Sequence, residues 1–191
     1  MKPATPTAAT EGKEQDPVQA DYQQGLQFLQ DKNYSQAAMA MHNALVGYEQ
    51  QEKEEGIANA NDKLGDICLA QQQYEKALPH FEKAYAICKQ HDDLMSLLAL
   101  RKKLIFCHRG LQQFDEALQL YLELLDVYEA MNNPGSTVET MVGMAETYQE
   151  KGDLQNAADA YNTAADIHAN FKHTRHAEKL RTLARELEAR I

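Results

Sequence analysis

The chain has 191 residues, of which 43% are apolar and 25% charged, and its 19 basic and 29 acidic residues give a net charge of −10. With a mean hydropathy of −0.61, this composition excludes both a disordered chain and a membrane protein, whose helices need about 18 consecutive apolar residues. The acidic balance also argues against nucleic acid or anionic lipid as the main partner, because both favour clustered lysine and arginine.

The N-terminal segment, residues 1–17, mixes proline, threonine, alanine and glutamate without a period, which predicts a disordered tail. It has no apolar stretch of the kind found in signal peptides, so we expect a cytoplasmic protein. Three cysteines, Cys68, Cys88 and Cys107, lie about twenty residues apart, which suits neither a disulfide framework nor a metal knuckle. We expect them to act as small apolar residues in a reducing compartment.

Four similar segments follow the tail at a constant spacing of 40 residues. They are 33–38, 73–78, 113–118 and 153–158. In each copy an apolar period near 3.6 residues runs before the segment and another runs after it, which predicts two helices joined by a short loop. β-branched clusters bounded by turn residues are absent, so no strand is predicted. The predicted units are 18–57, 58–97, 98–137 and 138–177.

Small residues recur where the two helices of a unit should meet. Gly65 is expected to face Ala77, so that the helices approach closely, and leucine at Ala77 or Ala117 should overpack the pair. A single hairpin of this size cannot bury its apolar face, so the units must stack into a solenoid. Residues 174–191 then carry apolar residues at helical spacing, which predicts a C-terminal capping helix over the last unit. These residues are Ala177, Leu180, Leu183, Ala184 and Leu187.

The motif of the second unit resembles the tetratricopeptide repeat. It reads Leu64-Gly65-x-x-Cys68 and then Tyr74-x-x-Ala77-x-x-x-Phe81-x-x-Ala84, and the likeness extends over about 18–177. The resemblance implies an all-α solenoid of four such repeats plus the capping helix. The usual repeat has about 34 residues and a proline after its second helix. Here the period is longer and that proline is missing, so we expect lengthened helices, similar to those of kinesin light chains and of cell-polarity adaptors that grip extended peptides.

No pattern in the chain indicates an enzyme. The sequence lacks a Ser, His and Asp trio in a motif context and a glycine-rich phosphate loop, and we expect no cofactor and no metal. His168, His173 and His176 are close in sequence, and two of them could share a helix face as metal ligands do. No cysteine or carboxylate accompanies them at ligand spacing, so a polar end of the array is the favoured interpretation.

Function is therefore expected on the inner, concave wall, which the first helix of each unit lines in folds of this kind. Positions i, i+4 and i+7 of those helices predict a partner-binding stripe that begins apolar, becomes acidic, then basic, and ends mixed. Its members are Tyr22, Leu26, Leu29, Asp62, Asp66, Leu69, Lys102, Phe106, Arg109, Val142, Glu146 and Gln149.

The third unit stands out by charge, because residues 94–114 hold four basic side chains and no acid. These are Arg101, Lys102, Lys103 and Arg109. One interpretation is a seat for a partner's carboxylate, phosphate or acidic peptide, with Phe106 as an apolar platform between Lys102 and Arg109. The other is that Lys102 and Arg109 pair with Asp62 and Asp66 on the neighbouring helix, a contact worth about 0 to 1 kcal/mol.

Chaperone-binding members of the family hold a peptide carboxylate with lysine and asparagine at inner positions of the first two units. Tyr22, Leu26, Asp62 and Asp66 occupy such positions here, so we do not predict that activity.

The sequence supports two hypotheses about function. The first is a non-enzymatic scaffold or adaptor that binds a protein or peptide partner in the concave groove. The second is a self-assembling structural unit that forms weak homo-oligomers through its ends or its groove. The charged residues of the last helix favour the first hypothesis, because a polar end blocks further stacking. They are Arg181, Arg185, Glu186, Glu188 and Arg190.

Overall fold

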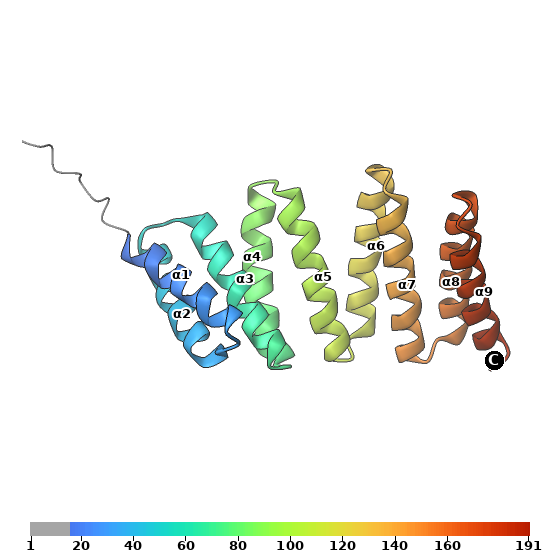
Figure 1. Cartoon of the computed structure of the whole chain (residues 1–191), viewed down its shortest axis with the longest axis horizontal. Coiled ribbons are helices and arrows are strands. Elements are labelled where there is room, and N and C mark those ends of the chain that lie inside the picture. The colour runs from blue at the N-terminus through green and yellow to red at the C-terminus, as the bar shows by residue number, and fades with distance from the viewer. Residues whose placement is uncertain (1–15) are drawn as a thin grey trace, which may run out of the picture.

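The computed structural model describes residues 16–191, and within that range all regular structure is α-helical. The helices stand side by side in chain order (Figure 1). Their bounds are α1 Pro17–Gln30, α2 Tyr34–Gln50, α3 Glu54–Ala70, α4 Tyr74–Gln90, α5 Leu94–Gly110, α6 Phe114–Ala130, α7 Pro134–Lys151, α8 Leu154–Asn170 and α9 Thr174–Glu188. The predicted solenoid of four helical hairpins and a capping helix is confirmed.

One kind of turn joins every pair of successive helices. Its middle residue has a positive φ, between 50° and 61° at seven non-glycine residues and 87° at Gly152. The next residue donates its backbone N–H to a carbonyl five residues earlier, as Gln73 does to Cys68 and Gln113 to His108, both at 2.9 Å. This is the Schellman arrangement, which satisfies carbonyls at the helix end. Three-residue turns between helices of mostly 17 residues account for the 40-residue period, so the predicted lengthening of the helices is confirmed.

Small residues set the close approach of the two helices within a unit, although the side chain nearest Gly65 is Phe81 and not the predicted Ala77. A Cβ added at Gly65 would lie 2.5 Å from Cε1 of Phe81, so only glycine lets this ring lie against α3. Ala77 and Ala117 are fully buried, and leucine at either position would have no free volume to enter. In the third unit the residue aligned with Gly65 is Ile105, which is itself buried.

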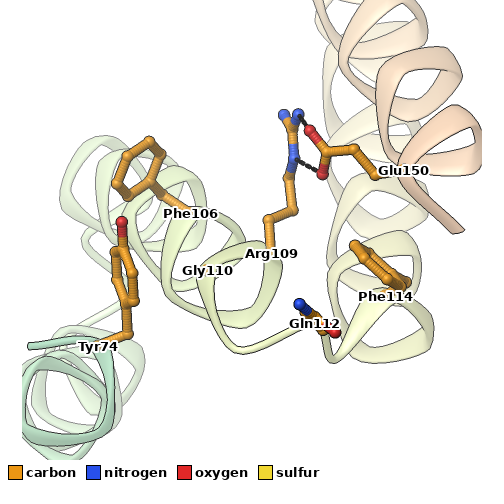
Figure 2. Close-up of a pocket in the computed structure, with 7 residues that line it drawn as sticks. All are labelled: Tyr74, Phe106, Arg109, Gly110, Gln112, Phe114 and Glu150. Carbon is orange, nitrogen blue, oxygen red and sulfur yellow. Dashed lines mark hydrogen bonds and ion pairs between the residues drawn. The ribbon is translucent and has the colours of Figure 1, made fainter. Parts of the chain in front are cut away.

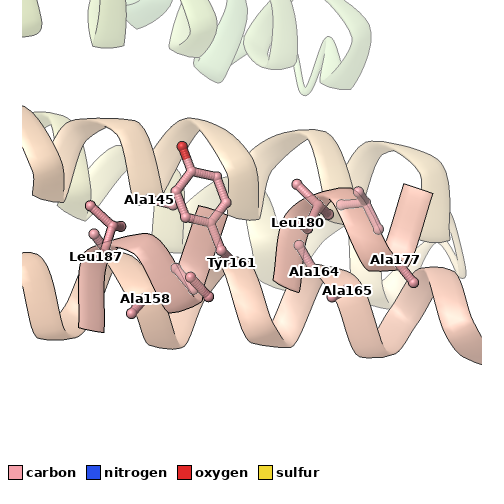
Figure 3. Close-up of a cluster of buried hydrophobic side chains, with 12 residues drawn as sticks. Ala145, Ala158, Tyr161, Ala164, Ala165, Ala177, Leu180 and Leu187 are labelled. Atoms are coloured by element: carbon pink, nitrogen blue, oxygen red, sulfur yellow. The ribbon is translucent and has the colours of Figure 1, made fainter. Parts of the chain in front are cut away.

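The last helix covers the apolar end of the array. Figure 3 shows its leucines and alanines against the small side chains of α8. The four residues of α9 that are buried there are Ala177, Leu180, Ala184 and Leu187. The opposite side of α9 is polar, since Arg181 pairs with Asp166 at 2.9 Å and Arg185 pairs with Glu178.

The first helix ends the array in a similar way. Leu64 and Ile67 of α3 are buried, whereas the residues 40 positions before them on α1, Gln24 and Gln27, are exposed. Both ends of the described array therefore present polar side chains, which does not favour continued stacking.

The structure shifts the predicted unit boundaries. Breaks at 57/58, 97/98 and 137/138 fall inside the first turns of α3, α5 and α7, whereas the chain turns at 51–53, 91–93 and 131–133. The period of a repeat fixes its length but not its starting point, which explains the offset. The predicted tail, 1–17, lies outside the described residues except for the last two, Asp16 and Pro17, where α1 begins. None of the helices described is long and apolar enough to cross a membrane.

Candidate functional site

The twelve predicted inner-wall residues lie on α1, α3, α5 and α7, and none of them is buried. The structure does not join them into one continuous site. On α1, Tyr22, Leu26 and Leu29 are half-buried and pack against the first hydrophobic cluster. The Tyr22 ring meets the Tyr48 ring edge-on, with centroids 6.2 Å apart. This end of the stripe therefore contributes mainly to packing.

The acidic part of the stripe, on α3, is neutralised by lysines. Nζ of Lys103 lies 2.6 Å from Asp62 and 2.7 Å from Asp66, and Nζ of Lys63 lies 2.9 Å from Asp62. Burial alone would raise the pKa of Asp62, but the hydrogen bonds from Lys103 and Lys63 outweigh it and hold this pKa below its ordinary value. Leu69, the third predicted residue here, is half-buried against the core of the second and third units.

The pairing that the sequence suggested for Lys102 and Arg109 is wrong. Lys103, and not these two residues, reaches Asp62 and Asp66. Successive residues of a helix point about 100° apart, so Lys103 faces back to α3 while Lys102 faces forward to α7. The periodicity of the sequence does not determine the rotation of α5 about its own axis, and a shift of one residue along the helix is enough to change the ion-pair partner.

Lys102 and Arg109 pair with three glutamates of α7. Lys102 lies 3.5 Å from Glu139, and Arg109 lies 3.6 Å from Glu146. Arg109 also binds Glu150 through two nitrogens, at 2.6 and 3.2 Å. These hydrogen bonds raise the pKa of the Arg109 guanidinium.

The remaining basic residue of the third unit, Arg101, binds Glu123 at 3.1 Å. All four cations of that unit thus have a carboxylate partner, which leaves no free cation for the predicted anion seat. An acidic ligand would have to displace existing ion pairs.

A hollow of about 570 Å³ opens beside the ion pair of Arg109 and Glu150 (Figure 2). It is lined by Tyr74, Phe106, Arg109, Gly110, Gln112, Phe114 and Glu150. Phe106 is 55% exposed, and its ring stands edge-on to Tyr74 with centroids 6.0 Å apart. A Cβ added at Gly110 would lie 2.6 Å from the Tyr74 ring, so this glycine permits the tyrosine to line the hollow.

A second hollow, of about 320 Å³, lies between α5, α6 and α7 and shares Arg109 with the first. Tyr121 lines it and receives a hydrogen bond from Arg109 at 3.4 Å. A Cβ at Gly143 would lie 2.6 Å from the Tyr121 hydroxyl, so a glycine again makes room for an aromatic wall. Val142 and Glu146 of the predicted stripe also face this hollow. We call the two hollows together the α5–α7 cleft.

Sequence reasoning missed several residues of this cleft, because some lie outside the first helices of the units and others lie on those helices at positions that the predicted spacing skips. Tyr74 and Phe114 begin α4 and α6, where the motif suggested only core packing, and Glu139 and Glu150 lie on α7 between the predicted positions. Gly110 and Gly143 were the available signals, since glycine inside a helix often permits close approach of a neighbour. Gln149, which was predicted, instead accepts a hydrogen bond from Tyr161 at 3.1 Å.

Three histidines lie close together at the C-terminal end of the array, and one cysteine is fully buried. The rings of His168, His173 and His176 cluster between α8 and α9, with centroids 5.3 to 6.3 Å apart. Yet no group of three or more potential ligands among residues 16–191 is arranged to hold a metal ion. Burial raises the pKa of Cys107 to about 11, and a thiol that stays protonated is a poor nucleophile.

Comparison with known proteins identifies the repeats. A model of the tetratricopeptide repeat family matches residues 17–90 and 96–170. No curated protein sequence matches this chain.

Several solved structures share the fold. Kinesin light chain TPR-like repeats from Podosopora anserina superpose with a TM-score of 0.69 at 16% identity, over 92% of this chain and 98% of that one. BtubC from P. vanneervenii gives 0.64 at 13% identity, over 90% and 80%. A Rap protein complexed with Competence and Sporulation Factor gives 0.62 at 17% identity, over 87% of this chain and 48% of that one. At such identities the likeness shows the fold alone.

Proposed function

Because this chain belongs to the tetratricopeptide repeat family, we propose that it is a non-enzymatic scaffold that binds a segment of a partner protein in the α5–α7 cleft. The observation that carries the proposal is the 55% exposure of Phe106 in a hollow formed by four helices and a turn. An aromatic side chain in such a place supplies a large apolar contact area at little entropic cost, as binding hot spots do.

The family and the shape of the cleft support this proposal. Stacked helical repeats create extended surfaces that bind other chains. One protein that shares the fold, a Rap protein, was solved in complex with Competence and Sporulation Factor. We expect the other positions of the inner stripe to contribute less, because their side chains are packed or paired within the chain.

Selection from a display library of random peptides tests the proposal. We expect the wild type to enrich peptides whose affinity falls about tenfold or more in Phe106→Asp, as the loss of a hot spot predicts. Met95→Asp is the matched control, because Met95 is 71% exposed on the same helix and does not line the cleft. If Phe106→Asp binds the selected peptides as tightly as Met95→Asp does, the cleft is not the binding site.

The alternative, self-assembly, has less support from the described residues. Both end helices present polar side chains outward, Gln24 and Gln27 on α1 and Arg181 and Arg185 on α9. Sedimentation at several concentrations should give the mass of one chain, and a mass that rises with concentration would favour assembly. We also infer a cytoplasmic location, because all three cysteines are free thiols and thiols stay reduced in the cytosol.

A further inference from the structure

Resting on the proposed function, we propose that the occupant of the α5–α7 cleft is a basic and apolar protein segment, which places an arginine or lysine beside an aliphatic or aromatic residue. This assignment reverses the anion seat that the sequence suggested for the third unit.

The first argument is the charge that the cleft presents. Its two cations, Lys102 and Arg109, face three carboxylates, those of Glu139, Glu146 and Glu150. The side chain of Arg109 is only 22% exposed and its guanidinium is bound by carboxylates and a tyrosine hydroxyl. Glu146 and Glu150 keep 50% and 45% of their side-chain surface exposed. Lys102 is 47% exposed but is paired with Glu139, which is 72% exposed, so the three carboxylates outweigh the two cations and the accessible charge of the cleft is negative.

The second argument is the aromatic wall. Tyr74, Phe106 and Phe114 line the same hollow as Glu150 (Figure 2). A cation over an aromatic ring is attracted by the ring's quadrupole, and arginine makes this contact most often. One arginine entering the hollow would thus meet an aromatic face and a carboxylate together. The remaining exposed surface of Phe106 suits a neighbouring apolar side chain.

The third argument is the charge of the whole chain. A net charge of −10 attracts basic segments and repels acidic ones during encounter, which changes association rates more than the final affinity. An acidic segment would associate more slowly with the acidic chain, and once bound it would be repelled by the exposed carboxylates of α7. Specificity of this kind comes from repulsion of the wrong partner as much as from attraction of the right one.

Three fluorescein-labelled synthetic peptides of equal length test the inference by fluorescence anisotropy with the full chain. They alternate Leu with Arg, Leu with Glu, and Ser with Arg. We expect the Leu–Arg peptide to bind at least about tenfold more tightly than either of the others. Its binding should weaken in Phe106→Asp, and rising salt should reduce it, since exposed charges are screened.

A charge-neutralising pair sharpens the test. In Glu146→Gln with Glu150→Gln, Arg109 loses both carboxylates, so binding of the Leu–Arg peptide should fall and binding of the Leu–Glu peptide should rise. The matched control neutralises two exposed glutamates outside the cleft, Glu129→Gln with Glu186→Gln. It changes the net charge equally and should leave both affinities near those of the wild type.

The outcomes separate this inference from the function on which it rests. Tight, Phe106-dependent binding of the Leu–Glu peptide overturns the basic partner but leaves the cleft as the binding site. An equal loss of Leu–Arg binding in the control pair also overturns it, because the attraction is then unspecific. If none of the three synthetic peptides and no library peptide binds in a Phe106-dependent way, the proposed function itself fails.

Discussion

The second and third units have the same backbone design and differ in what their inner sides present. In the second unit, Gly65 lies against the buried ring of Phe81, and Asp62 and Asp66 are neutralised by lysines. In the third unit, Ile105 takes the place of the glycine and Phe106 projects into a hollow. The comparison indicates that packing between helices constrains positions such as Gly65 and Ile105, whereas the partly exposed inner positions differ in charge and size from one unit to the next.

The largest effect should distinguish the two phenylalanines. Phe81→Ala removes a ring that is 0% exposed and should reduce the free energy of unfolding by about 3 to 5 kcal/mol. Phe106→Ala removes a ring that is mostly solvated and should cost less than about 1 kcal/mol. Urea unfolding followed by circular dichroism measures both, and similar losses would contradict the contrast between a packing ring and a binding ring.

The second-largest effect on stability is expected when the small residue at the helix contact of the second unit, Gly65, is replaced. Gly65→Ile gives the second unit the residue of the third, but its Cβ would lie 2.5 Å from Phe81. We expect a loss in stability near 3 kcal/mol, the upper end of the usual range of about 1 to 3 for overpacking. The control, Ile105→Val, should cost only about 0.5 to 1.5 kcal/mol. Thermal unfolding measures both variants. If their melting temperatures fall by the same amount, the second unit tolerates a wider helix spacing than its packing indicates.

Two neighbouring lysines should differ in their effect on stability. Lys103→Ala leaves Asp62 and Asp66 with Lys63 alone, and should cost about 1 to 2 kcal/mol near pH 7, since hydrogen bonds to charged groups are among the stronger ones. Lys102→Ala affects a pair whose acid, Glu139, is 72% exposed, and should change stability by less than about 0.5 kcal/mol.

The penalty for Lys103→Ala should also depend on pH. The pKa of Asp62 is lowered in the folded chain from its ordinary 3.8, so its pairing stabilises the fold above that value and is lost as the pH falls through the lower, folded-state pKa. The difference between wild type and Lys103→Ala should therefore shrink when unfolding is measured in acid. A difference that stays constant from neutral pH to acid would assign the effect to packing of the lysine stem.

The smallest expected effect tests whether the two units share a backbone. Gln72 and Gln112 occupy the same place in their turns, with φ of 58° and 59°. A non-glycine residue in this left-handed conformation destabilises the fold by about 1 to 2 kcal/mol. Glycine removes that strain, but it also loses more conformational entropy on folding, which cancels part of the gain. Gln72→Gly and Gln112→Gly should each stabilise the protein by about 0.5 to 1 kcal/mol in chemical unfolding. Clearly unequal gains would argue that the turns are not equivalent.

Much of the fold was accessible from the sequence because it depends on local periodicity. The apolar period near 3.6 residues gives helices, the 40-residue spacing gives equal units, and small residues such as Gly65 and Ala77 mark the close contacts. The starting point of each unit is not accessible, since any window of 40 residues satisfies the same period, which is why the predicted boundaries fall inside helices.

What the sequence by itself determined is the stacked array of long hairpins and the polar helix that closes it, because those follow from which residues must be buried. The tertiary structure alone decided which lysine meets Asp62, and that Arg109 is bound by Glu146 and Glu150. Such pairings depend on the rotation of each helix and on contacts between residues about 40 positions apart, which no local pattern encodes. The cleft beside Phe106 likewise arises only when Gly110 lets Tyr74 turn toward it.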